Sequence, residues 1–242
     1  MQFKIILILI FISRIFYSQG YYNSQFLEDP GEPRHLHFGY SVSVSGDYLA
    51  VGAYGNSSYD NPGSVSLWCK KSQNWEFVKT IQEGDSLEYS NIGENVSLDG
   101  EQLLLTVSQR VKDNTFLPQK AYLYLKDAGG HDNWGLIKEF SRPPDDPGSF
   151  AINGVIKGEY VIIVGIKDSS PTTYEINIYN RNEGGVNNWG LVKNLQMSSI
   201  VSDLELDGDK LLIGCENIAY LYYRNEGGEN NWGLKKNFYR WT

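Results

Sequence analysis

Cysteine is scarce in this chain of 242 residues, which has only two cysteines, two methionines and three histidines. Two cysteines exclude the disulfide-dense scaffold on which many small secreted domains depend. Cys69 and Cys215 could form one bridge if the protein is exported. Both lie in apolar segments, however, where a free cysteine is often a small buried hydrophobe. The sequence leaves these two interpretations open.

The small number of histidines limits the metal and general-base chemistry of the chain. His35 and His37 alternate, so a strand would place them on one face, but no third ligand follows at motif spacing and a solvated loop is the simpler interpretation. His131 occupies a turn position that Val186 and Glu229 take in two similar turns, which indicates a surface residue. There is no Gly-x-Ser-x-Gly elbow and no glycine-rich phosphate loop. We expect a protein that is not an enzyme and that binds no metal or other cofactor.

No apolar run is long enough to cross a bilayer, which takes about 20 residues. The longest run, residues 5–12, follows Lys4 and ends before Ser13 and Arg14. A basic residue, a short apolar stretch and small residues at 18 and 20 predict a signal peptide over residues 1–20. An uncleaved anchor is the alternative. After removal of the signal peptide we expect no membrane span and a secreted, extracellular or cell-envelope location.

Positive charge is also in short supply, with 21 Lys and Arg against 29 Asp and Glu and a formal net charge of −8. Lys4 and Arg14 fall in the predicted leader, so the mature chain is near −10 (−8 minus 2). An acidic chain without a basic cluster argues against nucleic acid and anionic membranes as partners.

What the chain has is a repeat, Gly-Gly-x-x-Asn-Trp-Gly-Leu, at residues 129–136, 184–191 and 227–234. A worn fourth copy remains at residues 72–75. Self-similarity at this spacing predicts an array of similar units that stack to bury their apolar faces. The repeated tryptophans are expected to pack between units with their N–H groups bonded to backbone; stacking on sugars is the alternative. These residues are Trp75, Trp134, Trp189 and Trp232.

A second repeated signal is a Gly-Asp or Gly-Glu turn at Gly46, Gly100, Gly158 and Gly208, each between two apolar runs. Such turns predict hairpins, because glycine readily adopts the positive φ that they require. A third and a fourth strand follow in every unit. The predicted fold is therefore all-β, a β-propeller or partial propeller of about four four-stranded antiparallel blades. The expected units are 36–84, 85–142, 143–197 and 198–242.

The segment before the first unit, residues 21–35, could add an outer strand that closes the last blade. Unit four already carries its own last strand, however. A closed ring, an open arc and an arc completed by another chain remain as alternatives, and self-association to complete the propeller is one expected partner interaction.

The pair Phe38-Gly39 with residues 51–54 (Val-Gly-Ala-Tyr) resembles the FG-GAP repeat of integrin α-chain propellers and of many exported proteins. The resemblance covers residues 36 to 242, although units two to four lack the Phe-Gly pair. It implies a secreted or cell-surface propeller that acts in binding or adhesion. The calcium loop of many family members needs several closely spaced acidic or amide side chains. Residues 43–48 offer only Asp47, so the family calcium site is not retained.

Recognition is expected in the loops that differ between units, because repeated frames usually bind through their variable connections. The long loops 56–62 and 110–118 predict a surface for a protein or glycan partner. A glycan-binding or carbohydrate-active protein is the alternative function. Asn56 and Asn95 begin Asn-x-Ser sequons and are candidate glycosylation sites. The candidate binding residues are Tyr54, Tyr59, Asp60, Arg110 and Phe116.

Overall fold

The structure is a computed structural model that describes residues 25–30, 37–56, 61–82, 89–108, 110–112, 115–143, 148–169 and 171–239. Within these ranges every regular element is a β-strand. The predicted signal peptide, residues 1–20, lies outside them. No helix in the described ranges is long and apolar enough to cross a membrane.

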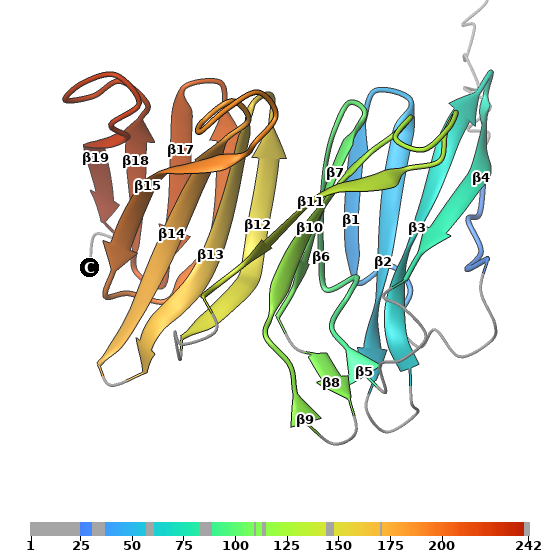
Figure 1. Cartoon of the computed structure of the whole chain (residues 1–242), viewed down its shortest axis with the longest axis horizontal. Coiled ribbons are helices and arrows are strands. Elements are labelled where there is room, and N and C mark those ends of the chain that lie inside the picture. Colours follow the sequence, from blue (N-terminus) through green and yellow to red (C-terminus); the bar gives the residue numbers. More distant parts are fainter. Residues whose placement is uncertain are drawn as a thin grey trace, which may run out of the picture.

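Four antiparallel sheets of four strands each form the molecule, which confirms the predicted fold class (Figure 1). One sheet falls within each of the four expected units. The first contains β1 (Ser41–Ser45), β2 (Tyr48–Asn56), β3 (Asn61–Lys71) and β4 (Asn74–Ile81). The second contains β6 (Asn95–Asp99), β7 (Gln102–Val107), β10 (Lys120–Leu125) and β11 (Gly135–Ser141). The third contains β12 (Ser149–Lys157), β13 (Tyr160–Ser169), β14 (Thr172–Asn180) and β15 (Gly190–Met197). The fourth contains β16 (Val201–Asp207), β17 (Lys210–Cys215), β18 (Ile218–Tyr223) and β19 (Gly233–Tyr239).

A small fifth sheet was not predicted. Its strands belong to the second unit: β5 (Tyr89–Ser90) precedes β6, and β8 (Arg110–Lys112) and β9 (Thr115–Phe116) come from the long connection between β7 and β10.

The first hairpin of every sheet has a two-residue turn that begins with glycine. The four turn glycines, at positions 46, 100, 158 and 208, have φ between 57° and 59°. In the first sheet Ser45 pairs with Tyr48, and the other three sheets repeat this closing pair. Positive φ in a two-residue loop matches the twist of the strands, so these turns fix the register of each hairpin.

The core is divided into three hydrophobic clusters, one at each junction between successive sheets. The cluster between the first two sheets, for example, joins Ala50 and Leu67 of the first sheet to Leu98, Leu105 and Trp134 of the second. The inner strands pack in chain order, β1 on β6, β6 on β12 and β12 on β16. The second and third sheets therefore bury both faces against their neighbours, whereas the first and fourth sheets each bury one face.

The repeated tryptophans lie in these junctions, as predicted. Trp134, Trp189 and Trp232 are at most 2% exposed, and each takes φ near +50° at the end of its turn. One detail was wrong: within the part of the chain that the structure describes, the indole nitrogens of Trp134 and Trp232 have no hydrogen-bond partner. Trp134 instead meets the edge of the Tyr48 ring of the preceding sheet, with ring centroids 5.3 Å apart.

The worn copy adopts a different conformation. A two-residue turn over residues 72–73 places Trp75 inside β4, where it is half-buried. Its backbone N–H donates to Oε1 of Gln25, and its carbonyl oxygen accepts from Nε2 of the same side chain. Residues 25–30 thus run along the first sheet and form no strand of the last, so the suggested closing strand is wrong for this described part of residues 21–35.

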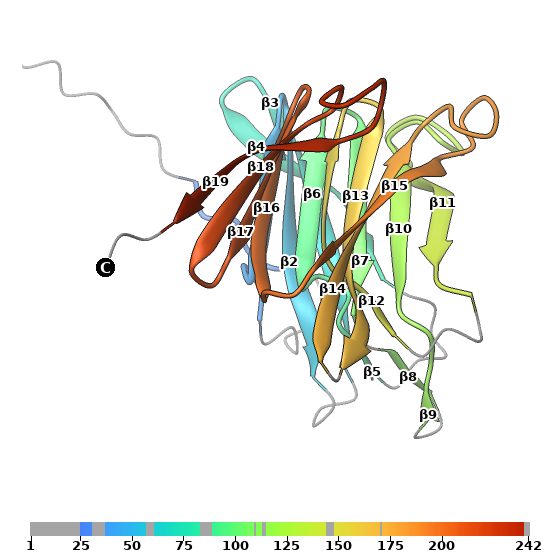
Figure 2. The same ribbon diagram turned by 90° about the vertical axis from the view of Figure 1, so that its left-hand side faces the viewer.

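The ring is open among the described residues: nothing comparable to the three junctions joins β16 to β1. The fourth sheet (red) and the first sheet (blue to cyan) lie at opposite sides of Figure 1, and Figure 2 shows the fourth sheet from its outer side. Cys69 of β3 and Cys215 of β17 are both free cysteines, so the structure does not contain the suggested disulfide.

Candidate binding surface

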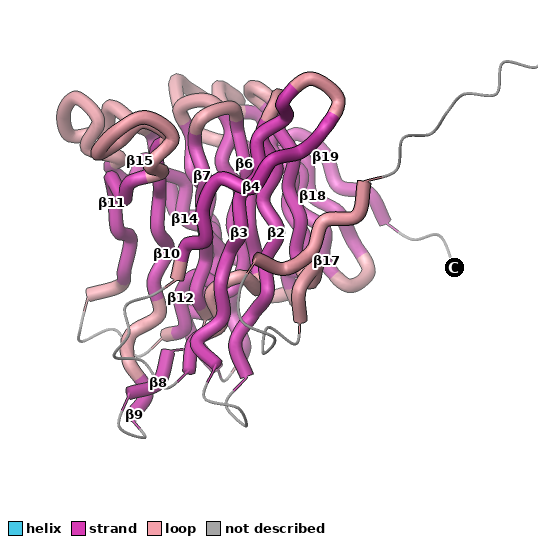
Figure 3. The backbone as a smooth tube through the Cα atoms, turned by 90° about the vertical axis from the view of Figure 1, so that its right-hand side faces the viewer, coloured by secondary structure: helices cyan, strands magenta, loops and turns pink. Residues whose placement is uncertain are grey.

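The two ends of the strands differ in kind. The glycine hairpin turns and the tryptophan turns lie at one end, which we call the turn end (Figure 3, top). The connections β2–β3, β7–β10, β13–β14 and β17–β18 lie at the other, which we call the loop end (Figure 1, bottom). Antiparallel pairing requires this arrangement, because successive connections alternate between the two ends of a sheet. The connections that vary between units therefore share the loop end.

An aromatic cluster lies on the first sheet near the loop end. The ring of Tyr54 is stacked on that of His37, with centroids 4.1 Å apart and planes 10° from parallel. Tyr40 meets Tyr54 edge-on at 4.5 Å and is 58% exposed. His37 lies in a turn before β1, as expected, but it is half-buried against Tyr54 rather than fully solvated, and His35 lies outside the described residues. The cluster presents aromatic faces and edges together with polar tips, which suits either protein or sugar contacts.

The Phe-Gly motif positions this cluster. Gly39 has φ of +90°, and its N–H and that of Tyr40 both donate to the carbonyl oxygen of Gly52, at 3.0 and 3.2 Å. Phe38 packs edge-on against Trp68, with centroids 5.8 Å apart. Phe38 therefore anchors this segment to the first sheet. The residues on either side of the Phe-Gly pair, His37 and Tyr40, belong to the aromatic cluster.

The other predicted binding residues are placed only in part. Arg110 lies in β8 and its Nη1 donates to the carbonyl oxygen of Pro118 at 3.1 Å. Phe116 lies in β9. The small sheet is joined to the first sheet, because β5 packs against both β2 and β3. Tyr59 and Asp60 lie outside the described residues.

The two candidate glycosylation sites are in unlike positions. Asn95 is held at the junction of the second and third sheets, where its Nδ2 donates to Oδ1 of Asn153 at 2.8 Å. A glycan on this nitrogen would break that contact. Asn56 ends β2 at the loop end and pairs with Asn61.

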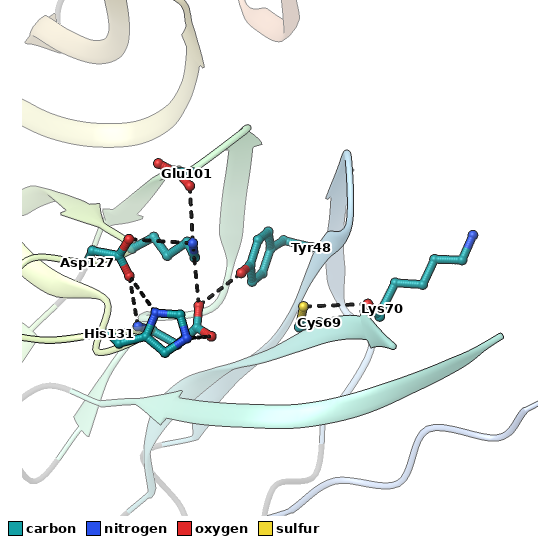
Figure 4. Close-up of polar contacts among 8 residues, drawn as sticks. Tyr48, Cys69, Lys70, Glu101, Asp127 and His131 are labelled. Carbon is teal, nitrogen blue, oxygen red and sulfur yellow. Dashed lines mark hydrogen bonds and ion pairs between the residues drawn. The ribbon is translucent and has the colours of Figure 1, made fainter. Parts of the chain in front are cut away.

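A polar cluster at the turn end is the one group of possible metal ligands in the described ranges (Figure 4). It consists of Asp127, His131 and Asp132. The Nζ of Lys126 lies 3.5 Å from Asp127 and 3.9 Å from Asp132, so one ammonium group already forms ion pairs with both carboxylates. A hydrogen bond to Glu101 raises the pKa of Lys126, and a backbone N–H from Asp132 lowers the pKa of Asp127. The cluster is an ion-pair network, and His131 is a surface residue that is 83% exposed.

Sequence reasoning missed the counterparts of Gly39 in later units. Gly39 stands seven residues before its turn glycine (39 and 46), and Gly93 and Ala151 stand at the same distance from theirs (93 and 100, 151 and 158). Gly93 has φ of +91° and Ala151 has φ of +55°. These units therefore keep a left-handed backbone at this position although they lack the Phe-Gly pair. The constant distance to the turn glycine was the signal that could have revealed them.

Stacked four-stranded blades in an open arc define the class of this molecule as a propeller-like β-repeat protein. Residues 34–68 match the family model of the FG-GAP repeat. The matched range includes the Phe38-Gly39 pair, β1, β2 and most of β3, so the first sheet is similar to an FG-GAP repeat.

No curated protein matches the sequence. Among solved structures, a functionally unknown protein from Desulfotomaculum acetoxidans is similar at 9% identity, with a TM-score of 0.42. The alignment covers 82% of this chain and 69% of that one.

Proposed function

We propose that this protein is a secreted or cell-surface binding module that acts without catalysis and contacts its partner through the loop end. The observation that carries the proposal is the aromatic cluster of His37, Tyr40 and Tyr54, which the FG-GAP repeat holds beside the variable connections. Aromatic side chains on a rigid frame are favoured at recognition sites, because they offer a large contact area at a small cost in conformational entropy.

The position of the cluster supports a role in recognition rather than folding. Tyr40 packs with one edge on Tyr54 and leaves 58% of its surface exposed, whereas the tryptophans of the junctions are buried. The small sheet with Arg110 lies beside β2 and enlarges the surface next to the cluster. A partner with both apolar and hydrogen-bonding groups fits this combination.

A glycan is the second candidate partner, and the parallel stacking of His37 on Tyr54 is the observation that favours it. A sugar ring could bind against the exposed part of the Tyr40 ring, where its C–H groups would meet the negative face of the aromatic system.

The test is a binding screen of the mature chain on a glycan array and on an array of extracellular protein domains. The Tyr40→Ser variant should lose binding about tenfold or more, as expected when an aromatic anchor is truncated. Tyr239→Ser is the matched control, because Tyr239 is equally exposed (65%) but lies on β19 of the fourth sheet. Equal binding by Tyr40→Ser and the native chain, or turnover of the bound glycan or protein, would contradict the proposal.

A further inference from the structure

The junctions between sheets repeat several contacts, and the inner strands form the same one at the first two junctions. Ser43 and Ser45 accept hydrogen bonds from the backbone N–H groups of Leu98 and Gly100, at 2.9 and 2.8 Å. One junction further, Ser97 and Asp99 accept from Ile156 and Gly158, at 3.1 and 2.7 Å. Acceptor side chains one and three residues before the turn glycine thus bind the edge of the next inner strand.

The fourth sheet carries the same acceptors with no sheet after it. Asp207 and Glu205 stand one and three residues before Gly208, at the positions of Ser45 and Ser43. Both side chains are exposed, and in the described part of the chain neither accepts a hydrogen bond or forms a close ion pair; the charge of Lys157 acts on both from the third sheet. At the junction of the third and fourth sheets the corresponding positions hold Val155 and Lys157, so the acidic pair does not continue a local trend.

The outer face of the fourth sheet also exposes an apolar side chain at a position that is buried in the second and third sheets. Leu212 of β17 is 42% exposed, whereas Leu104 and Ile162 at the same position are completely buried. Its cross-strand partners are Glu205 and Leu221, which is half-buried. We call this surface, defined by Glu205, Asp207, Leu212 and Leu221, the trailing face.

The first sheet exposes apolar side chains on its opposite, outer face. Val42 and Val44 of β1 are 69% and 67% exposed, whereas Val96 and Leu98 at the same positions of β6 are 7% and 6% exposed. The N–H of Leu98 points off the sheet to Ser43, so the N–H of Val44, in the same register, points off the edge of β1. We call Val42, Val44 and this edge of β1 the leading face.

A lysine contact repeats in the same way. Lys79, Lys138 and Lys193, each four residues after its tryptophan, donate to the turn asparagine of the following sheet at 2.6 to 2.9 Å. Lys236 is the fourth member, and it lies over the ring of Phe238 at 5.1 Å instead. The fourth sheet therefore carries three features by which a sheet contacts the sheet after it: acceptor side chains, an apolar patch and a lysine.

We propose that a second copy of this chain docks head to tail, with the trailing face of one copy on the leading face of the other. The carboxylates of Glu205 and Asp207 would accept from the N–H groups of Val44 and Gly46, and Leu212 would cover Val42 and Val44. Because the two faces differ, the contact is heterologous, and it closes into a ring only if the rotation between copies allows it. The proposal is independent of the binding function of the loop end.

The junction between copies is weaker than the internal ones at its turn end. Lys126 and Arg224 lie over the rings of Tyr48 and Tyr160 of the preceding sheet, each 5.6 Å from the ring centroid. Lys70 of the first sheet stands at the position of Lys126 and Arg224. In the intermolecular junction it would face Lys210 of the fourth sheet, which stands at the position of Tyr48 and Tyr160. Two like charges oppose each other there, so the association is reversible and depends on concentration.

The experiment measures the mass of the mature chain in solution by light scattering and sedimentation over the micromolar to millimolar range. The native chain should exceed the monomer mass as concentration rises. Val44→Lys and Glu205→Lys should each remain monomeric, because the first blocks the leading face and the second places a cation against the backbone N–H groups. Val186→Lys and Glu229→Lys, which change exposed residues of the tryptophan turns, are the matched controls and should associate as the native chain does.

The mixture of the two blocked variants is decisive. Val44→Lys keeps its trailing face and Glu205→Lys keeps its leading face, so together they should form a complex of one copy each and nothing larger. Lys210→Tyr should tighten the association of the native chain roughly two- to tenfold, since it removes the lysine pair and adds a cation–π contact. A native chain that stays monomeric, blocked variants that still associate, or a mixture without a complex would each overturn the proposal.

Discussion

The hydroxyl of Tyr48 donates a hydrogen bond to Oδ1 of Asp132 at 2.9 Å, across the junction of the first and second sheets. Tyr160 donates to Oδ1 of Asn230 at 2.8 Å across the junction of the third and fourth. In both cases the ring also meets the tryptophan that closes the same turn. At these two junctions one tyrosine thus contacts two parts of the repeated motif, the tryptophan and the Asn or Asp two residues before it.

Tyr48→Phe tests the polar half of this contact. The variant keeps the ring against Trp134 and removes only the hydroxyl, so the free energy of unfolding should fall by about 1 kcal/mol, with Asp132 able to turn to solvent. Urea denaturation measures the change. Tyr223→Phe is the control, because no hydrogen bond of the Tyr223 hydroxyl is present in the described structure and its effect should stay within about 0.5 kcal/mol. Equal effects of both variants would mean that the Asp132 bond contributes nothing.

Gln102→Tyr tests the whole motif as a gain of stability. Gln102 stands where Tyr48 and Tyr160 stand, and a cavity of about 200 Å³ lies beside it, lined also by Arg181, Asn187 and Trp189. A tyrosine here should fill this space, meet Trp189 and donate to Asn187, while Arg181 moves over the new ring as Arg224 does over Tyr160. We expect a gain of about 1 kcal/mol, the size common for cavity filling.

The control for this variant is Gln102→Phe, which fills the cavity without the hydroxyl. It should gain less than Gln102→Tyr when both are compared by thermal unfolding. A loss of stability with Gln102→Tyr would show that the two hydrogen bonds of Gln102, from Arg181 at 2.7 Å and to the carbonyl oxygen of Gly158 at 3.2 Å, outweigh the repeated arrangement.

Gly93→Ala tests the close approach of the first two sheets. A methyl group on Gly93 would meet the carbonyl oxygen of Ser64 and would lie 2.8 Å from the nitrogen of Ala53, which is closer than real Cβ contacts. Gly39 has almost the same φ, +90° against +91°, but open space around it. Gly39→Ala should therefore cost only the backbone strain, about 1 kcal/mol, and Gly93→Ala should cost about 2 kcal/mol more. Equal losses in chemical denaturation would refute the steric argument.

The alkaline stability of the chain should depend on Tyr179. Burial, together with the negative charge of Glu175, raises the pKa of Tyr179 from 10.0 to about 12. Between these values the unfolded chain loses the phenolic proton and the folded chain keeps it, so the stability falls as the pH rises from 10 to about 12. The full contribution of this shift is on the order of 2–3 kcal/mol and is present below pH 10.

Tyr179→Phe should flatten this part of the pH profile, since phenylalanine has no proton to lose. Comparison with the native chain isolates Tyr179 from the other groups that titrate at high pH. The ring contact with Phe140, 4.7 Å between centroids, is retained by phenylalanine, so the variant should fold normally at neutral pH. Parallel stability curves from pH 10 to 12 would contradict the assignment.

The fold could be predicted from the sequence because its defining features are local. A two-residue turn at Gly46 needs only neighbouring residues to set positive φ, and the same is true of the turns that end at Trp134, Trp189 and Trp232. Once the turns are known, the apolar runs between them must be strands, and their repetition gives the blades. Burial of the tryptophans followed from the same repetition.

The features that were missed depend on contacts distant in sequence or on a single unit. The stacking of His37 on Tyr54 joins segments on either side of β1, and no local pattern announces it. The small sheet joins two separate segments of a single unit, so no repeat could reveal it. The open ring depends on how far each sheet is rotated against the next, which is a sum over whole junctions.

The small sheet of β5, β8 and β9 also shows how tolerant the scaffold is of new material. Two of its strands, β8 and β9, lie between β7 and β10, yet those two strands keep an uninterrupted register from Lys120 opposite Val107 to Leu125 opposite Gln102. Foreign segments grafted into the equivalent connections, such as that between β17 and β18, should therefore be displayed side by side without disturbing the stack. A molecule of this design can acquire new specificities one hairpin at a time.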